Sequence, residues 1–331
     1  MKVLKYILFC LAIGLWSCGE DDLSSSSNFT DETVTPNEFD QWLYSNYTEP
    51  YNVQFNYRYV DIESDTEYNL IPADQAKSLA LAKLIKYLWI DSYVEINETV
   101  DPTFMQTYCP KVIQLIGSAA YNEDNTRVLG QAEGGLKITL YEVNGIDLSN
   151  ISVEAMNELW FHTMHHEFTH ILNQQKDYST DYKLISNADY NSSGWTNLSD
   201  LEALHLGFIS AYGSSEPNED FVETTSLYLV HDQAWWDAQL ELAKEEQVTQ
   251  AEFDAYTGTD GVKQLRVVTN ADGTTSNTYY IVYGGNLKIT EKLNIVKKYF
   301  HDEWGFELED LRTIIQRRSA SINTLDLTSY N

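Results

Sequence analysis

The sequence predicts an α+β protein, because strand patterns come first along the chain and long helix patterns come later. Residues 51–62 and 136–143 alternate apolar with polar side chains, which is typical of strands. Residues 153–175 follow Ser152, a good helix N-cap, and carry apolar side chains at helical spacing. We expect one body over residues 36–331, long enough for one large domain or for two lobes that share a cleft.

The remaining elements are predicted from the same two periodicities. The strand at 136–143 is expected to be half-buried, with Leu136, Ile138 and Leu140 on its inner face and the turn Asn144-Gly145 after it. A loop-like span is expected over 176–200. Helices are predicted over 74–94, 199–211, from near Asn218, 232–246, 288–304 and 308–322, and a hairpin is predicted over 264–285 around Asp272-Gly273.

The first residues are typical of an export signal. Two lysines precede an apolar run from Tyr6 to Trp16, about half of the ~20 residues that a membrane-spanning helix needs. Leu15-Trp16-Ser17-Cys18 resembles a bacterial lipobox, although Trp16 departs from the usual small residue. We predict a signal peptide over 1–17 and a palmitate-type lipid on Cys18, with an ordinary signal peptide cut nearby as the alternative.

Residues 18–35 are acidic, rich in serine and poor in apolar side chains, so we predict a flexible tether. Acidic residues directly after the cysteine also resemble the export signal of surface-exposed outer-membrane lipoproteins, and a plain solvated linker is the alternative. The net charge of −29 argues against nucleic acid, whose binding needs a basic face. Cys109 is the one cysteine left in the body, which excludes an internal disulfide, and we expect a small buried hydrophobe.

The stretch His166-Glu167-Phe168-Thr169-His170 matches the zinc-protease pattern H-E-x-x-H. Residues four apart lie one turn apart on a helix, so both imidazoles can bind one ion while Glu167 reaches a water beside it. Phe168 belongs to the opposite, apolar side of the helix. A chance match in a chain with seven histidines is the alternative. Zinc catalysis needs a third protein ligand and an open position for water.

The third ligand is expected from a downstream helix. The metzincin continuation is absent, because the chain reads HILNQQK from His170 onward. Glu219 and Glu223 lie one turn apart on a helix that Pro217 can start. The first can bind zinc, and the second can accept the outer N–H of a zinc-binding histidine. A solvated acidic helix face is the alternative interpretation of this pair.

These motifs resemble the zinc site of gluzincins of the anthrax lethal factor type. In those enzymes H-E-x-x-H is followed by Y-G-x(5)-E-x-F-x-E, and this chain has Tyr212-Gly213 and then Glu219-Asp220-Phe221-Val222-Glu223. Val222 replaces a usual alanine. The resemblance implies that Glu219 is the third ligand and Glu223 the histidine's partner. It also implies that Tyr212 contacts the oxyanion or the leaving group, and that Phe221 is a packing residue.

Residues 45–320 also resemble a family of zinc metallopeptidase lipoproteins that accompany TonB-linked importers of the outer membrane. The supporting stretches are YNVQFNYRY, AEGGLKITLYEVN, HHEFTH, EDFVE and the C-terminal KLNIVKKYFHDEWGFELEDLRTIIQRR. The resemblance implies a zincin-like fold, with a strand-containing N-terminal lobe and a mainly helical C-terminal lobe flanking the active-site helix. The cleft would lie between about 36–175 and 176–331, and the hairpin at 257–283 is interpreted as an insertion.

The same resemblance implies one Zn²⁺ per chain, a peptide or protein substrate, and an importer complex as a partner. It implies a lipid-anchored protein of the outer membrane, exposed on the surface or facing the periplasm, that touches the membrane through its N-terminal lipid only. The alternatives to a peptidase are a non-catalytic binding lipoprotein of an uptake system, with a structural or vestigial zinc site, and a hydrolase of non-peptide amides.

Within the predicted mechanism, Glu167 is the general base and Tyr212 stabilises the oxyanion. The strand at 136–143 is expected to offer the edge along which an extended substrate adds. His165 is interpreted as a structural residue, and His162 and His205 are interpreted as surface or packing residues.

Overall fold

The computed structural model describes residues 35–59, 70–121, 127–128, 130–133 and 136–330. The chain divides into a unit of Met1–Asn37 and a unit of Glu38–Asn331, and the second unit carries everything discussed below. The predicted signal peptide, Cys18 and nearly all of the tether lie outside the described residues. Among the helices that are described, none is long and apolar enough to cross a membrane.

A four-stranded mixed sheet forms the base of the body. Its order is β1 (Gln54–Asn56), β2 (Val112–Leu115), β6 (Lys137–Leu140) and β5 (Gly130–Glu133). The first three strands run parallel, and β5 runs antiparallel to β6. Parallel strands are normally covered on both faces, which agrees with the apolar run that β2 presents. A separate two-stranded ladder joins β3 (Ala120–Tyr121) to β4 (Arg127–Val128).

The place of β6 corrects two predictions. The strand lies between β2 and β5, so the predicted substrate edge at 136–143 is wrong. The predicted half-burial, with an apolar inner face and a polar outer face, is also wrong. Thr139 and Tyr141 of the predicted outer face are buried, while Leu136 of the predicted inner face is 63% exposed. The alternating pattern correctly predicted a strand, but it could not predict that other elements cover both faces of that strand.

The helices of the first half cover this sheet. Alternating residues around β1 are buried as expected, although only three residues pair as a strand. The helix predicted over 74–94 is observed as one helical run capped by Asp74. The bounds are α2 Glu38–Leu43, π-helical η2 Tyr44–Thr48, α3 Glu49–Tyr51, α4 Gln75–Leu84, π-helical η4 Ile85–Ile90, α5 Asp91–Ile96 and α6 Phe104–Tyr108.

The long helix predicted over 153–175 is confirmed, with one irregular turn inside it. After a 3-10 turn η5 (Val143–Gly145), the Ser152 side chain accepts a hydrogen bond from the Ala155 N–H and starts the run. The run consists of α7 (Val153–Met156), a π-helical turn η6 (Asn157–Phe161) and α8 (His162–Gln175). Such π turns recur at functional sites, and this one ends directly before the histidine-rich segment.

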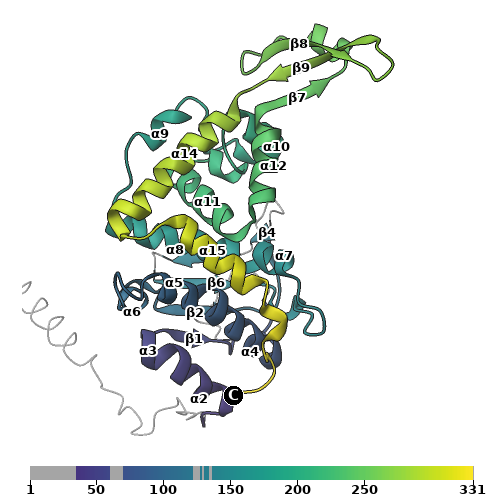
Figure 1. The fold of residues 1–331 in the computed structure, drawn as a ribbon. Helices are drawn as coiled ribbons and strands as arrows, with labels where there is room; N and C mark the ends of the chain where they lie inside the picture. Colours follow the sequence, from purple (N-terminus) through teal and green to yellow (C-terminus); the bar gives the residue numbers. More distant parts are fainter. Residues whose placement is uncertain (1–34, 60–69, 122–126, 129, 134–135, 331) are drawn as a thin grey trace, which may run out of the picture. The chain divides into compact units, whose positions relative to one another are not determined.

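The second half is mainly helical, and α11 (Pro217–Val230) lies at its centre. It packs against α8 on one side and against α14 (Gly285–Tyr299) and α15 (Leu308–Ser319) on others (Figure 1). The predicted helix at 199–211 ends earlier, at Leu206, because Gly207 adopts a left-handed φ of 94° that stops it. The others are α9 Tyr182–Ile185, η7 Trp195–Asn197, α10 Asp200–Leu206, η8 Tyr212–Ser214, α12 Gln233–Lys244, π-helical η9 Phe300–Trp304 and η10 Ile322–Thr324.

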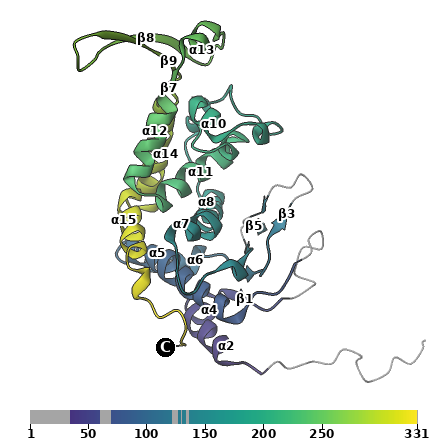
Figure 2. The ribbon, with the colours of Figure 1, turned by 90° about the vertical axis from the view of Figure 1, so that its right-hand side faces the viewer.

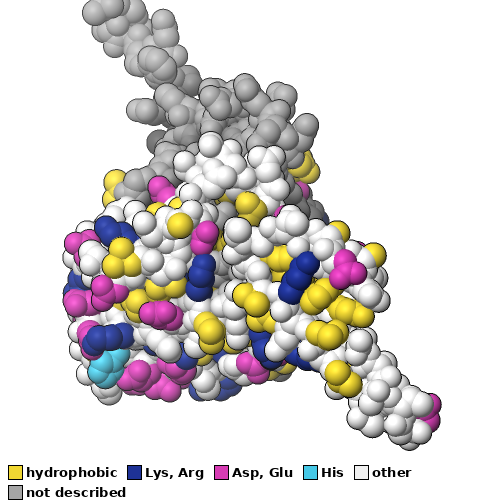
Figure 3. All heavy atoms as spheres, turned by 90° about the horizontal axis from the view of Figure 1, so that it is seen from above, with side chains coloured by type: hydrophobic (Ala, Val, Ile, Leu, Met, Phe, Trp, Pro, Cys, Tyr) yellow, Lys and Arg dark blue, Asp and Glu magenta, His cyan; other side chains and the backbone are white. Residues whose placement is uncertain are grey.

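An arm of three strands extends from the ends of α12 and α14 (Figures 1 and 2). It consists of β7 (Glu245–Val248), α13 (Gln250–Ala255), β8 (Val262–Thr269) and β9 (Thr275–Val282), in the sheet order β7-β9-β8. The hairpin predicted around Asp272-Gly273 is therefore confirmed and gains a third strand. Four of the eight residues of β8 are large hydrophobics that are well exposed, and Figure 3 shows this side of the molecule.

An aromatic cluster joins the helices over the sheet to the site helix. The ring of Phe168 makes edge-on contacts with Trp89, Tyr93 and Phe104, at centroid distances of 5.2, 4.9 and 6.0 Å. All four side chains are at most 2% exposed. Aromatic pairs in this geometry stabilise by more than their buried area alone, so the apolar back of α8 is firmly held. Cys109, 2% exposed, is buried as expected, and burial raises the pKa of its thiol.

A buried ion pair joins α11 to α14. Lys292 Nζ lies 2.7 Å from Asp220 Oδ2 and donates to the carbonyl of Gly207, also at 2.7 Å. The Tyr190 hydroxyl donates to the same carboxylate oxygen at 2.7 Å. Burial raises the pKa of Asp220 and lowers that of Lys292, and their mutual attraction opposes both shifts. Asp220 directly follows Glu219 in the first turn of α11, so the ion pair holds the turn that carries Glu219.

We expect Lys292→Met to lower the free energy of unfolding by about 3–5 kcal/mol, because it leaves the Asp220 carboxylate buried without its cation. Chemical denaturation followed by circular dichroism measures the loss. The control is Lys298→Met, which removes the exposed lysine beside Asp302 and should leave the midpoint close to that of the wild type. Equal midpoints for both variants would show that the buried pair has no structural role.

Candidate metal centre

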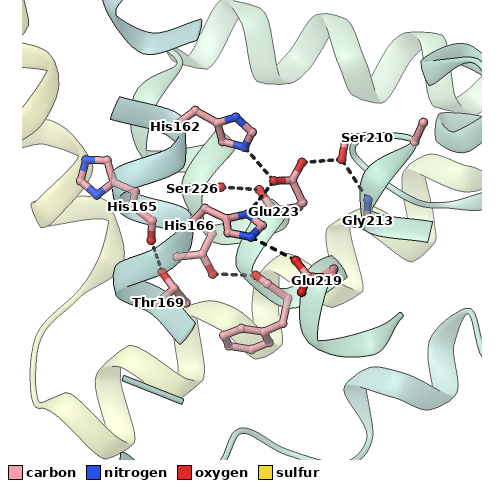
Figure 4. A network of polar contacts seen from close by, with 12 residues as sticks. His162, His165, His166, Thr169, Ser210, Gly213, Glu219, Glu223 and Ser226 are labelled. Atoms are coloured by element: carbon pink, nitrogen blue, oxygen red, sulfur yellow. Dashed lines mark hydrogen bonds and ion pairs between the residues drawn. The ribbon is translucent and has the colours of Figure 1, made fainter. Parts of the chain in front are cut away.

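Two packed helices and one loop bring the sequence-predicted residues together (Figure 4). α8 presents His166 and His170 from consecutive turns, as their spacing predicts. α11 presents Glu219 from its first turn and Glu223 from its second. Pro217 is the first residue of α11, where its missing N–H leaves no intrahelical hydrogen bond unmade. Although the segment with α9, η7, α10 and η8 separates α8 from α11 in the sequence, the two helices pack directly against each other.

His166, His170 and Glu219 form a group that could hold a metal ion. His166 Nε2 lies 3.0 Å from Glu219 Oε2, and His170 Nε2 lies 3.3 Å from Glu219 Oε1. Two ligand atoms held 2.0–2.1 Å from one zinc ion in a tetrahedron are roughly 3.3 Å apart. The spacing and the donor types therefore fit a tetrahedral zinc site with three protein ligands.

The electrostatics of this group favour a cation. Burial lowers the pKa of His166, but hydrogen bonds with Glu219 and Glu223 outweigh it and raise the pKa to about 10. Burial likewise raises the pKa of Glu219, but both histidines outweigh it and lower the pKa to about 2. A proton on the imidazole is thus strongly stabilised where carboxylates converge. A divalent cation can replace that positive charge, since metal binding displaces protons from its ligands.

Glu167 lies beside this group without belonging to it. Its pKa is raised, chiefly because the side chain is buried, although His166 and His170 act in the opposite direction. A carboxylate whose pKa is raised toward neutrality is a better general base than an ordinary surface glutamate. Its place in the sequence, next to His166 on the same helix, keeps it within the field of both imidazoles.

Glu223 is buried and fully engaged. Its Oε1 lies 2.8 Å from His166 Nδ1 and 2.8 Å from His162 Nε2, and its Oε2 accepts a hydrogen bond from the Ser210 hydroxyl at 2.5 Å. Burial raises the pKa of this carboxyl, but the charge and hydrogen bond of His162, with those of His166, hold it well below the usual range. With Nδ1 toward Glu223, His166 turns its Nε2 toward Glu219.

Tyr212 stands beside His166 on the short turn η8. The two rings are nearly parallel with centroids 5.9 Å apart, and the ring of Trp195 meets Tyr212 edge-on at 5.0 Å. Burial, together with the nearby Glu219 carboxylate, raises the pKa of Tyr212. The side chain is 38% exposed, so it borders both the site and solvent. Phe221 is fully buried, as expected of a packing residue.

Three other histidines, His162, His165 and His205, make specific contacts. His165 is buried and pairs with the Tyr93 hydroxyl at 3.1 Å, which confirms a structural role. His205 is buried and stacks on Tyr283 with centroids 3.6 Å apart, which confirms packing. His162 was missed, because it contacts Glu223 directly. Its position four residues before His166 was a usable signal, whereas no sequence pattern indicated Ser210.

The comparisons with known proteins show to which family the chain belongs. The family described as "Putative zinc-binding metallo-peptidase" matches residues 32–309. The chain belongs to this family. A crystal structure of a protein from Bacteroides caccae, described in the same words, superposes on this chain with a TM-score of 0.68. The two sequences are 39% identical, and the match covers 89% of this chain and 96% of the other chain. No curated protein matches the chain.

We expect the purified body to bind about one zinc per chain, since three ligands of the preferred types converge on one point. Glu219→Ala should reduce the zinc content far below that value, measured by mass spectrometry after dialysis. Glu291→Ala, at an exposed position on α14, is the matched control and should bind zinc as the wild type does. Undiminished zinc in Glu219→Ala would remove this residue from the ligand set.

Proposed function

We propose that the protein is a zinc-dependent peptidase whose metal is held by His166, His170 and Glu219. The observation that carries the proposal is the meeting of two imidazoles and one carboxylate at tetrahedral spacing, with Glu167 beside them. The group has three members among the described residues, which fits a catalytic site with an open position better than a structural site with four ligands. Membership of a family described as metallo-peptidases supports it.

The chemistry is divided between the metal and the side chains. When bound, zinc would supply a Lewis acid and lower the pKa of a coordinated water toward ~7. Glu167 would accept a proton from the attacking water and return it to the leaving amine. The Tyr212 hydroxyl, already within reach of Glu219, would donate a hydrogen bond to the oxygen that gains negative charge. Glu223 would hold His166 with its Nε2 toward the metal.

The extended substrate is best placed along β5. Among the described strands β5 pairs with β6 alone, and its other edge is our candidate for the backbone partner. It also packs against α8, the helix that carries the histidines. Addition of a peptide strand at such an edge provides backbone hydrogen bonds without demanding particular side chains. This assignment replaces the edge predicted at 136–143.

The cellular setting of the proposal rests on the sequence. A lipid on Cys18 would tether the body to the outer membrane through the acidic, serine-rich segment, where a TonB-linked importer could be its partner. Labelled palmitate should be incorporated into the full chain and not into a Cys18→Ser variant. Equal incorporation into both would contradict this attachment site.

We expect Glu167→Gln to retain zinc and to lose peptide cleavage by at least ~100-fold, because the amide cannot accept the proton of water. Tyr212→Phe should also retain zinc and should lower kcat by about 10- to 100-fold. A peptide library with product detection by mass spectrometry measures both. Wild-type protein that contains zinc and cleaves no library peptide would favour a non-catalytic binding protein.

A further inference from the structure

The carboxylate of Glu223 receives more donors than a histidine partner requires. Its Oε1 is shared by His166 Nδ1 and His162 Nε2, each at 2.8 Å, and its Oε2 is taken by Ser210. The side chain of Glu223 is 3% exposed, whereas that of His162 is 24% exposed. His162 therefore stands at the rim of the site and reaches inward to a buried acceptor (Figure 4).

Distances decide between a second metal site and a hydrogen-bonded cluster. The contacts of 2.8 Å that Glu223 makes with the two histidines are ordinary for charge-assisted hydrogen bonds and short of the roughly 3.3 Å expected between zinc ligands. His166 also has only two ring nitrogens, and its Nε2 faces Glu219. With Nε2 assigned to the zinc, Nδ1 carries the hydrogen that Glu223 accepts, so we assign His162, His166 and Glu223 to a hydrogen-bonded cluster although their spacing also admits a metal ion.

His162 is anchored well enough to act as a fixed donor. It is the first residue of α8, and the preceding π turn is held by two buried hydrogen bonds. Trp160 Nε1 donates to the carbonyl of Tyr141 at 2.7 Å, and Asn157 Nδ2 donates to the carbonyl of Val230 at 2.8 Å. These bonds connect the turn to the end of β6 and to the last residue of α11. The imidazole at 162 therefore has a defined position relative to Glu223.

We propose that His162 is a positioning residue of the metal centre, which holds the Glu223 carboxylate so that it in turn orients His166. The proposal rests on the proposed function, because it assigns His166 to the zinc. With His162 present, two rings one helical turn apart fix Oε1 between them, with centroids 6.1 Å apart and planes at 89°. Without it, Oε1 has one donor, and the carboxylate can turn away from His166. Partners of this kind typically change metal affinity 10- to 100-fold.

The first test measures zinc affinity of the metal-free chain by competition with a coloured chelator. His162→Phe keeps a ring but has no N–H, and it should raise the zinc Kd roughly 10-fold or more. His162→Gln places an amide N–H near the same point and should stay within about threefold of the wild type. The matched control is His301→Phe, which removes an exposed histidine that also bonds to a glutamate, Glu307, and should not change the Kd.

A double-mutant cycle tests whether His162 acts through Glu223. In a Glu223→Gln background, His162→Phe should change the zinc Kd little further, because the carboxylate it would position is gone. The Co²⁺-substituted chains provide a signature besides affinity: the visible absorption of His162→Phe should shift toward that of Glu223→Gln, and that of His162→Gln should resemble the wild type. Circular dichroism of the metal-free chains verifies that each variant is folded.

The outcomes separate this proposal from the proposed function. Wild-type chain that binds no zinc overturns both. Wild-type chain that binds zinc while His162→Phe binds it equally tightly overturns only the role of His162. Fully additive losses in the cycle also overturn it, because His162 would then act by another route. A selective loss in His162→Phe, rescued by His162→Gln, supports it.

Discussion

Burial of the Glu223 carboxylate between α8 and α11 is the constraint on which the site depends. Removing a carboxylate from water costs several kcal/mol unless hydrogen bonds replace the lost hydration. Here two imidazoles and one hydroxyl provide them. If α11 slipped by one turn, Glu223 would move 5.4 Å along the axis and Leu227 would face the histidines instead. These hydrogen bonds therefore help to hold the register of the two helices, which Glu219 shares.

The same arrangement explains why the site favours a positive charge. Glu219 and Glu223 approach His166 from its two nitrogens, and their combined effect raises its pKa far above the ordinary value in spite of burial. Glu167 adds a third carboxylate in the same field. Such a site binds a proton strongly in the absence of metal and can exchange it for a divalent cation.

A second buried charge pair holds the loop that carries Tyr212. Lys292 bonds to Asp220 on α11 and to the carbonyl of Gly207 at the start of the loop. Ser210 connects the middle of the loop to Glu223 and accepts the N–H of Gly213. The start and the middle of the loop are thus both connected to α11, the helix that supplies Glu219. This attachment positions Tyr212 on a segment without long regular structure.

Much of this could be predicted from the sequence, because the relevant signals are local. Helix periodicity placed the run at 153–175, and the spacing of four residues placed His166 with His170 and Glu219 with Glu223. The helix predicted at 199–211 begins where expected, since Ser199 and Glu202 form the capping box of α10. The resemblance to gluzincin motifs then related segments that are 49 residues apart. Each of these inferences needs only the geometry of a helix or a short motif.

Only the tertiary structure decided which elements meet. The alternation at 136–143 could not show that β6 lies in the middle of the sheet, because strand order depends on partners elsewhere in the chain. Ser210 and Lys292 carry no motif, and their contacts with Glu223 and Asp220 arise from segments brought together by packing. The sequence by itself determined the local geometry of the ligands. The packing of α8 on α11 decided their convergence, since a buried carboxylate must find its donors wherever the fold places them.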